Sequence, residues 1–224
     1  SSSLTVGLLH AFYLYRGRKV SRERLAREAC RVEIDILGKP IGKQDQYIAS
    51  YGGLKHIIFS PRDKVHVREL ALPAYQRKRL AGSLMLVYTG ISRKAEDILA
   101  DQKKKIPQSR PLLLAMKQQV LELKRALESG NLELLGHLLH QAWENKKRLS
   151  DNISNPEIDA LYYDCIKNGA LGGKICGAGG GGFLLLYCPP EKQERLRGVL
   201  GKSRELSFDF ADGGTEVILQ AQDG

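Results

Sequence analysis

Apolar residues near the start of the chain recur at helical spacing. The segment SSSLTVGLLHAFYLYRG predicts a helix with serines in its first turn and Gly17 beyond its end. A second helix is predicted from about Ser21, its expected N-cap, to Leu37, because Gly38 and Pro40 then stop it. Its inward face is expected to carry Leu25, Ala29, Val32 and Ile36.

Shorter apolar runs separated by turn residues come next. LKHIIF and VHVREL predict two strands joined by the turn residues SPRD. Residues 72–78 are interpreted as a connector, so we expect a domain boundary there, and LAGSLMLVYTG predicts a further strand. Two helices are then expected, at about 92–105 and 111–129.

The rest of the chain mixes helices and strands. Asn131 can cap one helix, and Asn155-Pro156-Glu157 is a strong start signal for another, which Gly169 ends. A glycine loop, the strand FLLLYC, a Pro-Pro break, a charged helix and a final strand near TEVILQ follow. The whole pattern predicts an α+β fold.

Composition places the chain among globular proteins. It has 224 residues, of which 42% are hydrophobic and 27% charged, enough to bury a sizeable core. No apolar run is long enough to cross a bilayer, and no secretory signal pattern is found. The four cysteines are scattered and form no CxxC pair, so we expect reduced thiols in a cytoplasmic protein.

The formal net charge of +10 admits two kinds of partner. Nucleic acid is one, but the basic residues are spread along the chain and no RNP-like interleaving with aromatics is present. The runs at 103–105 and 146–148 fall on predicted helices, where a solvated face is the simpler interpretation. A basic balance also suits an enzyme whose ligands are phosphorylated, so the charge alone does not decide.

Three segments carry candidate chemistry, and the first is Ser1-Ser2-Ser3. Free backbone N–H groups and the helix dipole make a helix start an anion site, and serine hydroxyls can reach a phosphate-bound Mg²⁺. Plain N-capping is the simpler interpretation of these residues alone. A Walker-type phosphate loop is excluded because no GxxxxGK[ST] is present.

The second segment is VEIDILGKPIGKQDQY. Glu33 lies at the edge of the inward helix face, where an ionised carboxylate is costly unless it meets a cation or a metal. Asp45 follows twelve residues later, beyond a loop whose glycines allow close approach to a ligand. Two such acids could divide Mg²⁺ binding and proton handling. Alternatively, Glu33 pairs with a helix neighbour and Asp45 caps the next helix.

The third segment, GGKICGAGGGGF, has five glycines among residues 177–182, directly before an apolar strand. Such a loop can adopt positive φ repeatedly and present its amides to a phosphate. Flexible linkers are usually polar and serine-rich, so a phosphate-binding role is favoured here.

These three segments, in this order, resemble the GHMP kinases. SSSLTVGLL is similar to the back half of the family's second motif, GKPIGKQDQY to the segment with the catalytic aspartate, and KICGAGGGGFLLLYC to the third motif. Within the class, LVYTGISRKAEDILADQ and SNPEIDALYYDCIKNGALGGKICGAGGGG most resemble the D-glycero-D-manno-heptose 7-phosphate kinases. The family's first motif and the glycines that precede the serines are not found, so the chain is expected to lack the N-terminal part of the family.

The resemblance implies a fold and a reaction. Residues 1–72 would be the back part of a ribosomal-protein-S5-like domain and residues 73–224 a ferredoxin-like C-terminal domain, with ATP and substrate meeting between them. The γ-phosphoryl group of ATP would pass to a sugar hydroxyl, the anomeric one of a heptose phosphate. A galactokinase-like or fucokinase-like activity is an alternative, as is a non-catalytic S5-like module that binds nucleic acid.

The resemblance also implies roles for residues. Ser1 or Ser2 would hold Mg²⁺ together with Glu33, and Asp45 would orient or deprotonate the attacking hydroxyl. Residues predicted to contact the nucleotide are Ser1, Ser2, Ser3, Gly177, Gly179, Gly180 and Gly181.

A sugar-phosphate kinase also needs an anion site for the acceptor's own phosphate. Ser92 and Arg93, at a strand end that leads into a predicted helix, are the candidates. Simple capping by Ser92 is the favoured interpretation of these two residues. His137 and His140 share a helix face but have no apparent third ligand, so we expect a surface pair and not a metal site.

Overall fold

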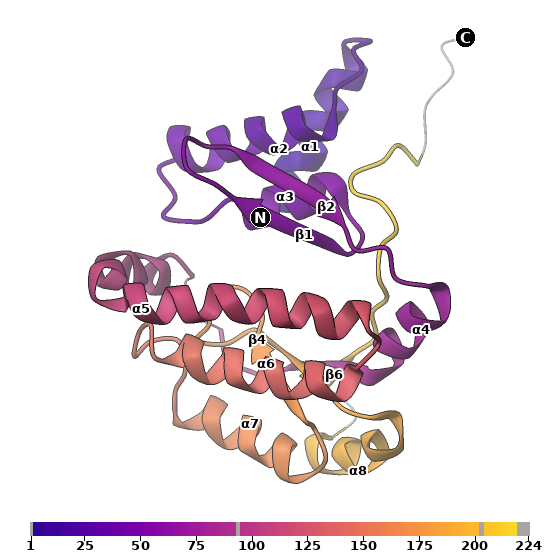
Figure 1. Cartoon of the computed structure of the whole chain (residues 1–224). Coiled ribbons are helices and arrows are strands. Elements are labelled where there is room, and N and C mark those ends of the chain that lie inside the picture. The colour runs from indigo at the N-terminus through magenta and orange to yellow at the C-terminus, as the bar shows by residue number, and fades with distance from the viewer. Residues whose placement is uncertain (1, 93–94, 202–203, 219–224) are drawn as a thin grey trace. The chain divides into compact units, whose positions relative to one another are not determined.

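The computed structural model describes residues 2–92, 95–201 and 204–218 of the chain (Figure 1). Two compact units are present. The first consists of residues 1–70 and 210–224, and the second of residues 71–209. Each unit is described by itself below.

The first unit packs helices against a two-stranded hairpin. Its elements are α1 (Ser2–Tyr15), α2 (Arg22–Cys30), the π-helix η1 (Arg31–Ile36), α3 (Gln44–Tyr51), β1 (Lys55–Phe59) and β2 (Val65–Glu69). The antiparallel hairpin runs in register from Lys55 opposite Glu69 to Phe59 opposite Val65. Ala26, Cys30 and Tyr47 form its small core, against which Ile57 and Val67 of the hairpin pack.

Local signals explain where the first helices begin and end. Ser21 caps α2, accepting a hydrogen bond from the backbone N–H of Arg24 at 3.2 Å, as predicted. Gly17 follows the end of α1 with a φ of +64°, also as predicted. The prediction that Ile36 faces inward is wrong, because Ile36 is 67% exposed. The π-helix has one more residue per turn than an α-helix, so the residues after Cys30 are rotated relative to the predicted inward face. Glu33 is buried in this segment and Ile36 is not.

The segment after residue 209 returns to the first unit. The backbone N–H of Gly53 donates to the carbonyl of Ala211 at 3.1 Å, and that of Thr215 donates to Ala49 at 3.0 Å. A Cβ on Gly52 would lie 1.9 Å from the backbone of Gly213, so only glycine allows this contact. The strand expected near TEVILQ is not formed in its described part, residues 215–218.

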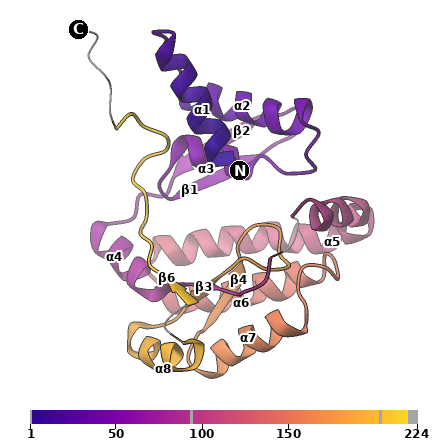
Figure 2. The same cartoon turned by 180° about the vertical axis from the view of Figure 1, so that it is seen from behind.

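The second unit has a four-stranded antiparallel sheet in the order β4-β5-β3-β6, with β3 (Leu84–Tyr88), β4 (Gly172–Ile175), β5 (Phe183–Tyr187) and β6 (Glu205–Leu206). Its helices are α4 (Ala74–Ser83), α5 (Ala95–Glu128), α6 (Leu132–Lys147), α7 (Pro156–Lys167) and α8 (Pro190–Leu200). Helices lie between β3 and β4 and between β5 and β6, which is the β-α-β-β-α-β order of a ferredoxin-like domain. The predicted α+β class is confirmed (Figure 2).

Two predictions in the second unit are wrong. Residues 74–83, taken as a connector and the start of a strand, form α4, and the strand is confined to residues 84–88. The two helices expected at 92–105 and 111–129 are a single helix of 34 residues with Pro107 and Pro111 inside it. Proline removes one intrahelical hydrogen bond, and the packing of α5 alongside α6 (Figure 1) offsets that loss.

The other predicted starts are confirmed. Asn131 caps α6 through the N–H of Leu134 at 3.1 Å, and Asn155 caps α7 through that of Ile158 at 2.8 Å. Strand β4 was missed, because its glycines hide the apolar pattern that a strand normally shows. Within the described residues, no helix is both long and apolar enough to cross a membrane.

Helix α6 and strand β4 approach each other at a pair of glycines. A Cβ on Gly172 would lie 2.0 Å from the carbonyl oxygen of Gly136 and 2.7 Å from the backbone nitrogen of His140. Such distances are impossible for a real side chain, so the approach depends on glycine at position 172. On the core side of α6, Trp143 is fully buried among the apolar residues of the unit.

Candidate active site

Glu33 is the best-connected buried acid of the first unit. It is 1% exposed, and its Oε2 accepts hydrogen bonds from Ser2 Oγ at 2.6 Å and from Gln46 Nε2 at 2.5 Å. Its Oε1 accepts from Thr5 Oγ1 at 3.3 Å and lies 3.6 Å from Lys39 Nζ. The alternative that Glu33 pairs with a neighbour on its own helix is therefore wrong. It joins the first turn of α1, the start of α3 and the loop between η1 and α3.

Electrostatics keep Glu33 ionised. Burial by itself raises the pKa of this carboxyl, but the hydrogen bonds from Ser2 and Gln46 and the charge of Lys39 outweigh burial and lower the pKa below its usual value. A buried anion with a serine hydroxyl against it presents hard oxygen donors. That is the donor set that Mg²⁺ takes when phosphates and water supply its other ligands.

Asp45 lies next to this cluster along the chain. It is in the first turn of α3 and its side chain is exposed, with no hydrogen bond or ion pair to another described residue. The N-cap of α3 is Lys43, so the alternative that Asp45 caps this helix is wrong. Gln46, the next residue, is fully buried and binds Glu33. Two carboxylates with different surroundings therefore lie near the start of α3: that of Asp45 has no partner among the described residues, and that of Glu33 accepts a hydrogen bond from Gln46.

The three serines at the start differ in their surroundings. Ser2 is 8% exposed and bound to Glu33, whereas Ser3 is exposed on α1. Ser1 lies outside the described residues. Of the described serines in this run, Ser2 is the one in position to share a cation with Glu33. The described residues contain no group of three or more His, Cys, Asp or Glu side chains that could hold a metal alone, so phosphate oxygens would be required as further ligands.

The glycine loop of the second unit, residues 177–182, connects β4 to β5. Gly177, Gly179, Gly180 and Gly181 have φ values of +75°, +116°, +73° and +147°. These values belong to the region that residues with a Cβ rarely adopt, which explains the glycines. The prediction of repeated positive φ is confirmed, while the contact with a nucleotide stays a prediction.

Two neighbouring segments fix the glycine loop. The N–H of Gly180 donates to the carbonyl of Ile153 at 2.8 Å, and the N–H of Gly182 donates to that of Ile91 at 2.8 Å. A Cβ on Gly181 would lie 2.4 Å from the Ile91 oxygen. These contacts hold the loop in one conformation, so its interpretation as a flexible linker is wrong.

The predicted second anion site receives no support. Thr89, just before it, is buried and donates its hydroxyl to the carbonyl of Gly182 at 2.9 Å, so it braces the glycine loop. Ser92 is exposed, and no hydrogen bond of its side chain to another described residue is found. Arg93 lies outside the described residues, so its role stays a prediction.

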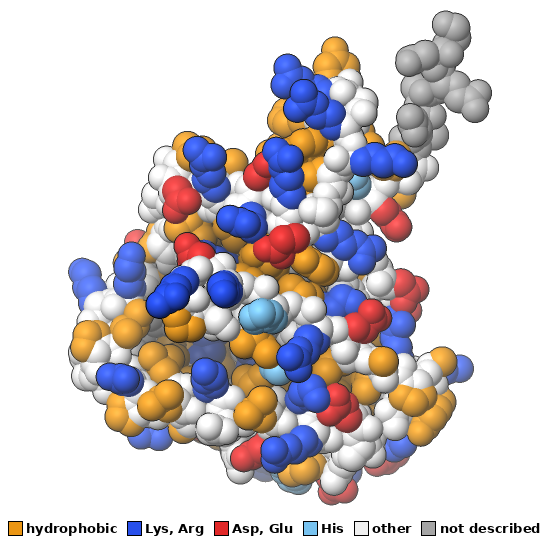
Figure 3. All heavy atoms as spheres, turned by 45° about the horizontal axis from the view of Figure 1, so that its top comes forward, with side chains coloured by type: hydrophobic (Ala, Val, Ile, Leu, Met, Phe, Trp, Pro, Cys, Tyr) orange, Lys and Arg blue, Asp and Glu red, His pale blue; other side chains and the backbone are white. Residues whose placement is uncertain are grey.

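The two histidines of α6 differ in their surroundings. His140 Nδ1 lies 2.8 Å from the hydroxyl of Tyr162, and the two rings stack at 5.9 Å, while His137 is exposed. On the face drawn in Figure 3, Lys and Arg side chains are interspersed with acidic and apolar ones and form no single basic patch.

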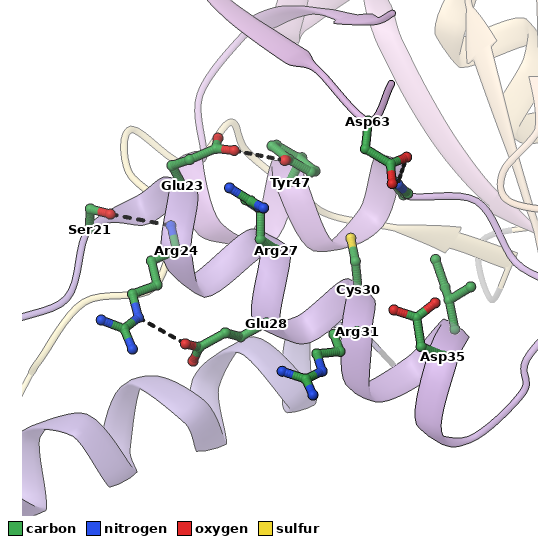
Figure 4. A pocket seen from close by; sticks show the side chains of 12 residues that line it. Ser21, Glu23, Arg24, Arg27, Glu28, Cys30, Arg31, Asp35, Tyr47 and Asp63 are labelled. Carbon is green, nitrogen blue, oxygen red and sulfur yellow. Dashed lines mark hydrogen bonds and ion pairs between the residues drawn. The ribbon is translucent and has the colours of Figure 1, made fainter. Parts of the chain in front are cut away.

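A pocket of about 640 Å³ in the first unit opens beside α2 (Figure 4). Its charged lining consists of Arg24, Arg27, Arg31 and Lys43 together with Glu23, Glu28, Asp35 and Asp63. Arg24 pairs with Glu28 at 2.8 Å and Lys43 with Asp63 at 2.6 Å. Four cations and four anions line the pocket, so it has no net charge with which to select a phosphate.

Three residues of the Glu33 cluster were missed by sequence reasoning. Gln46 follows Asp45 directly, Lys39 lies in the loop of the same motif, and Thr5 follows the serine run. Glutamine and lysine carry no sign in the sequence that they face a distant acid. The signal that could have found Gln46 is its place one residue beyond the predicted catalytic aspartate.

Comparisons with known proteins match both units of the chain to one family. The family model described as GHMP kinases N terminal domain matches residues 1–53, and the model described as GHMP kinases C terminal matches residues 123–204. The chain is 33% identical to D-glycero-alpha-D-manno-heptose 7-phosphate kinase of Campylobacter jejuni over 213 residues, which is 94% of this chain and 63% of that protein.

Two solved structures are similar in fold. A D-glycero-D-manno-heptose 1-phosphate kinase from Bacteroides thetaiotaomicron matches with a TM-score of 0.75 and 25% identity, over 95% of this chain and 60% of that one. A putative sugar kinase from Campylobacter jejuni matches with a TM-score of 0.74 and 31% identity, over 96% of this chain and 62% of that one. The chain thus spans about three fifths of the length of these relatives. Both of its units match, and the chain belongs to the GHMP kinase family.

Proposed function

We propose that the protein is an ATP-dependent sugar-phosphate kinase that transfers the γ-phosphoryl group to the anomeric hydroxyl of D-glycero-D-manno-heptose 7-phosphate. The observation that carries the proposal is the buried Glu33, bound both by Ser2 at the start of α1 and by Gln46, the residue after Asp45. The named activities of the relatives support a phosphorylated heptose as the acceptor.

Glu33 and Ser2 would hold the Mg²⁺ that accompanies ATP. The ion supplies charge neutralisation on the phosphate oxygens. Glu33 suits this role because its carboxylate is already ionised. A bound cation would take the place of the Lys39 ammonium and of the Ser2 hydrogen bond as partners of that carboxylate. Ser1, outside the described residues, remains a second candidate for the hydroxyl ligand.

Asp45 would act on the acceptor. The acceptor oxygen forms a bond to the γ-phosphorus, the bond from that phosphorus to the β–γ bridging oxygen breaks, and ADP leaves. The hydroxyl proton passes to the Asp45 carboxylate, which is exposed and has no partner among the described side chains that it would need to release. The rigid glycine loop would hold phosphate oxygens through its backbone amides. Because phosphoryl transfer depends mainly on positioning, orienting the hydroxyl is as much part of the Asp45 role as taking its proton.

The four cysteines are all free thiols, which supports a reduced, cytoplasmic setting as part of the proposal. No observation favours nucleic acid as a partner.

The test is ADP release by the full-length protein with Mg-ATP and a panel of acceptors: heptose 7-phosphate, heptose 1-phosphate, galactose, fucose and mevalonate. A kcat/KM highest for heptose 7-phosphate supports the proposal. A clear preference for an unphosphorylated acceptor would replace the sugar-phosphate assignment with another activity of the family, and absence of turnover with every acceptor would refute the kinase assignment.

A further inference from the structure

A cavity of about 760 Å³ lies in the second unit, at the end of the sheet opposite to the glycine loop. It is lined by one face of α4 and by the starts of α6 and α8, which lie at the same end of this unit (Figure 1). Ser83 and Cys188 bond to each other at this end of the sheet, whereas Thr89 and Gly182 do so at the other. Strand β5 between the two ends is roughly 16 Å long, so one phosphate group cannot reach both places. This α4–α8 cavity is therefore separate from the loop, and its volume falls in the range of roughly 300–1,000 Å³ typical of small-molecule sites.

Three basic side chains line the α4–α8 cavity without a counterion. Lys78 and Arg79 are on α4, and Lys192 is in the first turn of α8. In the described part of the chain, none of the three forms an ion pair or a side-chain hydrogen bond. In the pocket beside α2, by contrast, Arg24 and Lys43 have carboxylate partners. Helix α8 also begins without a side-chain cap, so both the cations and this helix start favour an anion in the cavity.

An unpaired aromatic ring lines the same cavity. Tyr75 precedes Lys78 and Arg79 by three and four residues, which places all three on one face of α4. Its side chain is exposed, and no described residue stacks on its ring. The Tyr75 hydroxyl accepts a hydrogen bond from Nε2 of the buried Gln76 at 3.2 Å, so its own proton is left to donate. The other end of this amide, Gln76 Oε1, is buried and has no hydrogen-bond partner among the described residues.

Two carboxylates complete the charged lining. Glu133 and Glu191 lie in the first turns of α6 and α8, where the helix dipole favours a negative charge. Neither has an ion pair or a side-chain hydrogen bond within the described residues. Because ionised carboxylates only accept hydrogen bonds, they require donors such as the hydroxyl groups of a sugar. An inorganic anion would satisfy the cations and leave these acids without a donor.

We propose that the α4–α8 cavity binds a nucleoside monophosphate. The phosphate would lie against the three cations, which outnumber the two carboxylates. The ribose hydroxyls would donate to the carboxylates, and the base would stack on the ring of Tyr75. All of these residues belong to the second unit, and none belongs to the proposed site of phosphoryl transfer. The proposal is therefore independent of the proposed kinase function.

Hydrogen–deuterium exchange of the full-length protein tests this site without turnover. AMP, GMP, CMP and UMP are compared, each alone and without an acceptor. At ten times its Kd, a nucleotide that fills the cavity should slow exchange in residues 74–83 and 189–200 about tenfold, because exchange there then proceeds mainly from unoccupied molecules. Protection of these two segments supports the proposal. Protection confined to the glycine loop, or protection by none of the four nucleotides, overturns it.

Partial ligands test the chemistry of the cavity. The nucleoside lacks the phosphate and ribose 5-phosphate lacks the ring, so each should bind at least tenfold more weakly than the protecting nucleotide, a difference of about 1.4 kcal/mol. Equal protection by ribose 5-phosphate would contradict stacking on Tyr75, and equal protection by the nucleoside would contradict an anion site.

Variants connect the protection to the named side chains. Arg79→Met and Lys192→Met keep apolar stems but lose the charge, and each should weaken the nucleotide at least tenfold. Tyr75→Leu should reduce its affinity to that of ribose 5-phosphate. Lys103→Met, which removes an exposed lysine of α5 outside the cavity, is the matched control and should change nothing. The exchanged side chains are all exposed, so the thermal midpoint should stay that of the wild type. Unchanged affinity in both Arg79→Met and Lys192→Met would overturn the site.

Discussion

Replacing Gly172 with alanine tests the close approach of α6 and β4. The added Cβ would lie 2.0 Å from the carbonyl oxygen of Gly136, whereas real Cβ contacts begin at about 3 Å. The three nearest atoms all belong to the backbone of α6, so no side chain can turn away to make room. Helix α6 must therefore move away from the strand by about 1 Å or more.

The cost follows from what α6 buries. Leu132 and Trp143 are buried and, at four and seven residues from Gly136, share its face of α6; a gap of about 1 Å there removes a quarter to a half of their dispersion contacts on that side. Overpacking of this kind typically costs about 1–3 kcal/mol, and a clash with backbone favours the upper end. For a chain of this size, about 3 kcal/mol lowers Tm by roughly 6–12 °C.

Thermal unfolding of the variant, followed by the fluorescence of Trp143, the sole tryptophan of the chain, measures this change. Gly198→Ala is the matched control, because Gly198 lies on α8 with nothing within 4 Å of a Cβ, and alanine there should stabilise the helix by about 0.5–1 kcal/mol. A Gly172→Ala variant that melts within one or two degrees of wild type would refute the claim that glycine is required for this packing.

Three further predictions concern the proposed active site. Asp45→Asn should lower kcat by at least about a hundredfold and leave KM for ATP nearly unchanged, and steady-state kinetics that show a rise in KM alone would instead indicate a binding role. Glu33→Gln should raise the Mg²⁺ concentration needed for half-maximal activity, and an unchanged magnesium titration contradicts the metal assignment. The folded-state pKa of Glu33 lies below its usual 4.5, so its ionised form stabilises the fold above pH 4.5, and this stabilisation is lost as the pH falls through the folded pKa. The difference in free energy of unfolding between wild type and Glu33→Gln should therefore shrink from pH 6 towards pH 3, as measured by denaturant titration at each pH.

The features that sequence predicted best are those with local causes. Ser21, Asn131 and Asn155 cap helices because each needs only a backbone N–H three residues ahead. The glycine loop was also found, since repeated positive φ is a property of the residues themselves. Such signals are complete within a few positions of the chain.

Features that depend on distant contacts were missed. Ile36 was expected to face the core, but the π-helix turns it outward and buries Glu33. The hydrogen bonds that Glu33 accepts from Ser2 and Gln46 stabilise this arrangement, and both donors are distant in sequence. The basic run 146–148 was assigned to a solvated helix face, and the sequence did not show that the Lys146 ammonium donates a hydrogen bond to the carbonyl of Gly177. Gly172, which lets β4 lie against α6, gives no indication in the sequence of its partner helix.

The π-helix η1 has a consequence for chain length. Its last hydrogen bond, from the N–H of Leu37 to the carbonyl of Val32, spans five residues instead of four, so this turn stores one surplus residue. Deleting Asp35, an exposed residue of the turn, would restore α-helical geometry without moving Glu33 off its side of the helix, and would shorten the path to Asp45 by one residue. We therefore expect kinases of this fold to tolerate single-residue insertions and deletions here, so that the count of residues between the two acids can vary while their chemistry is retained.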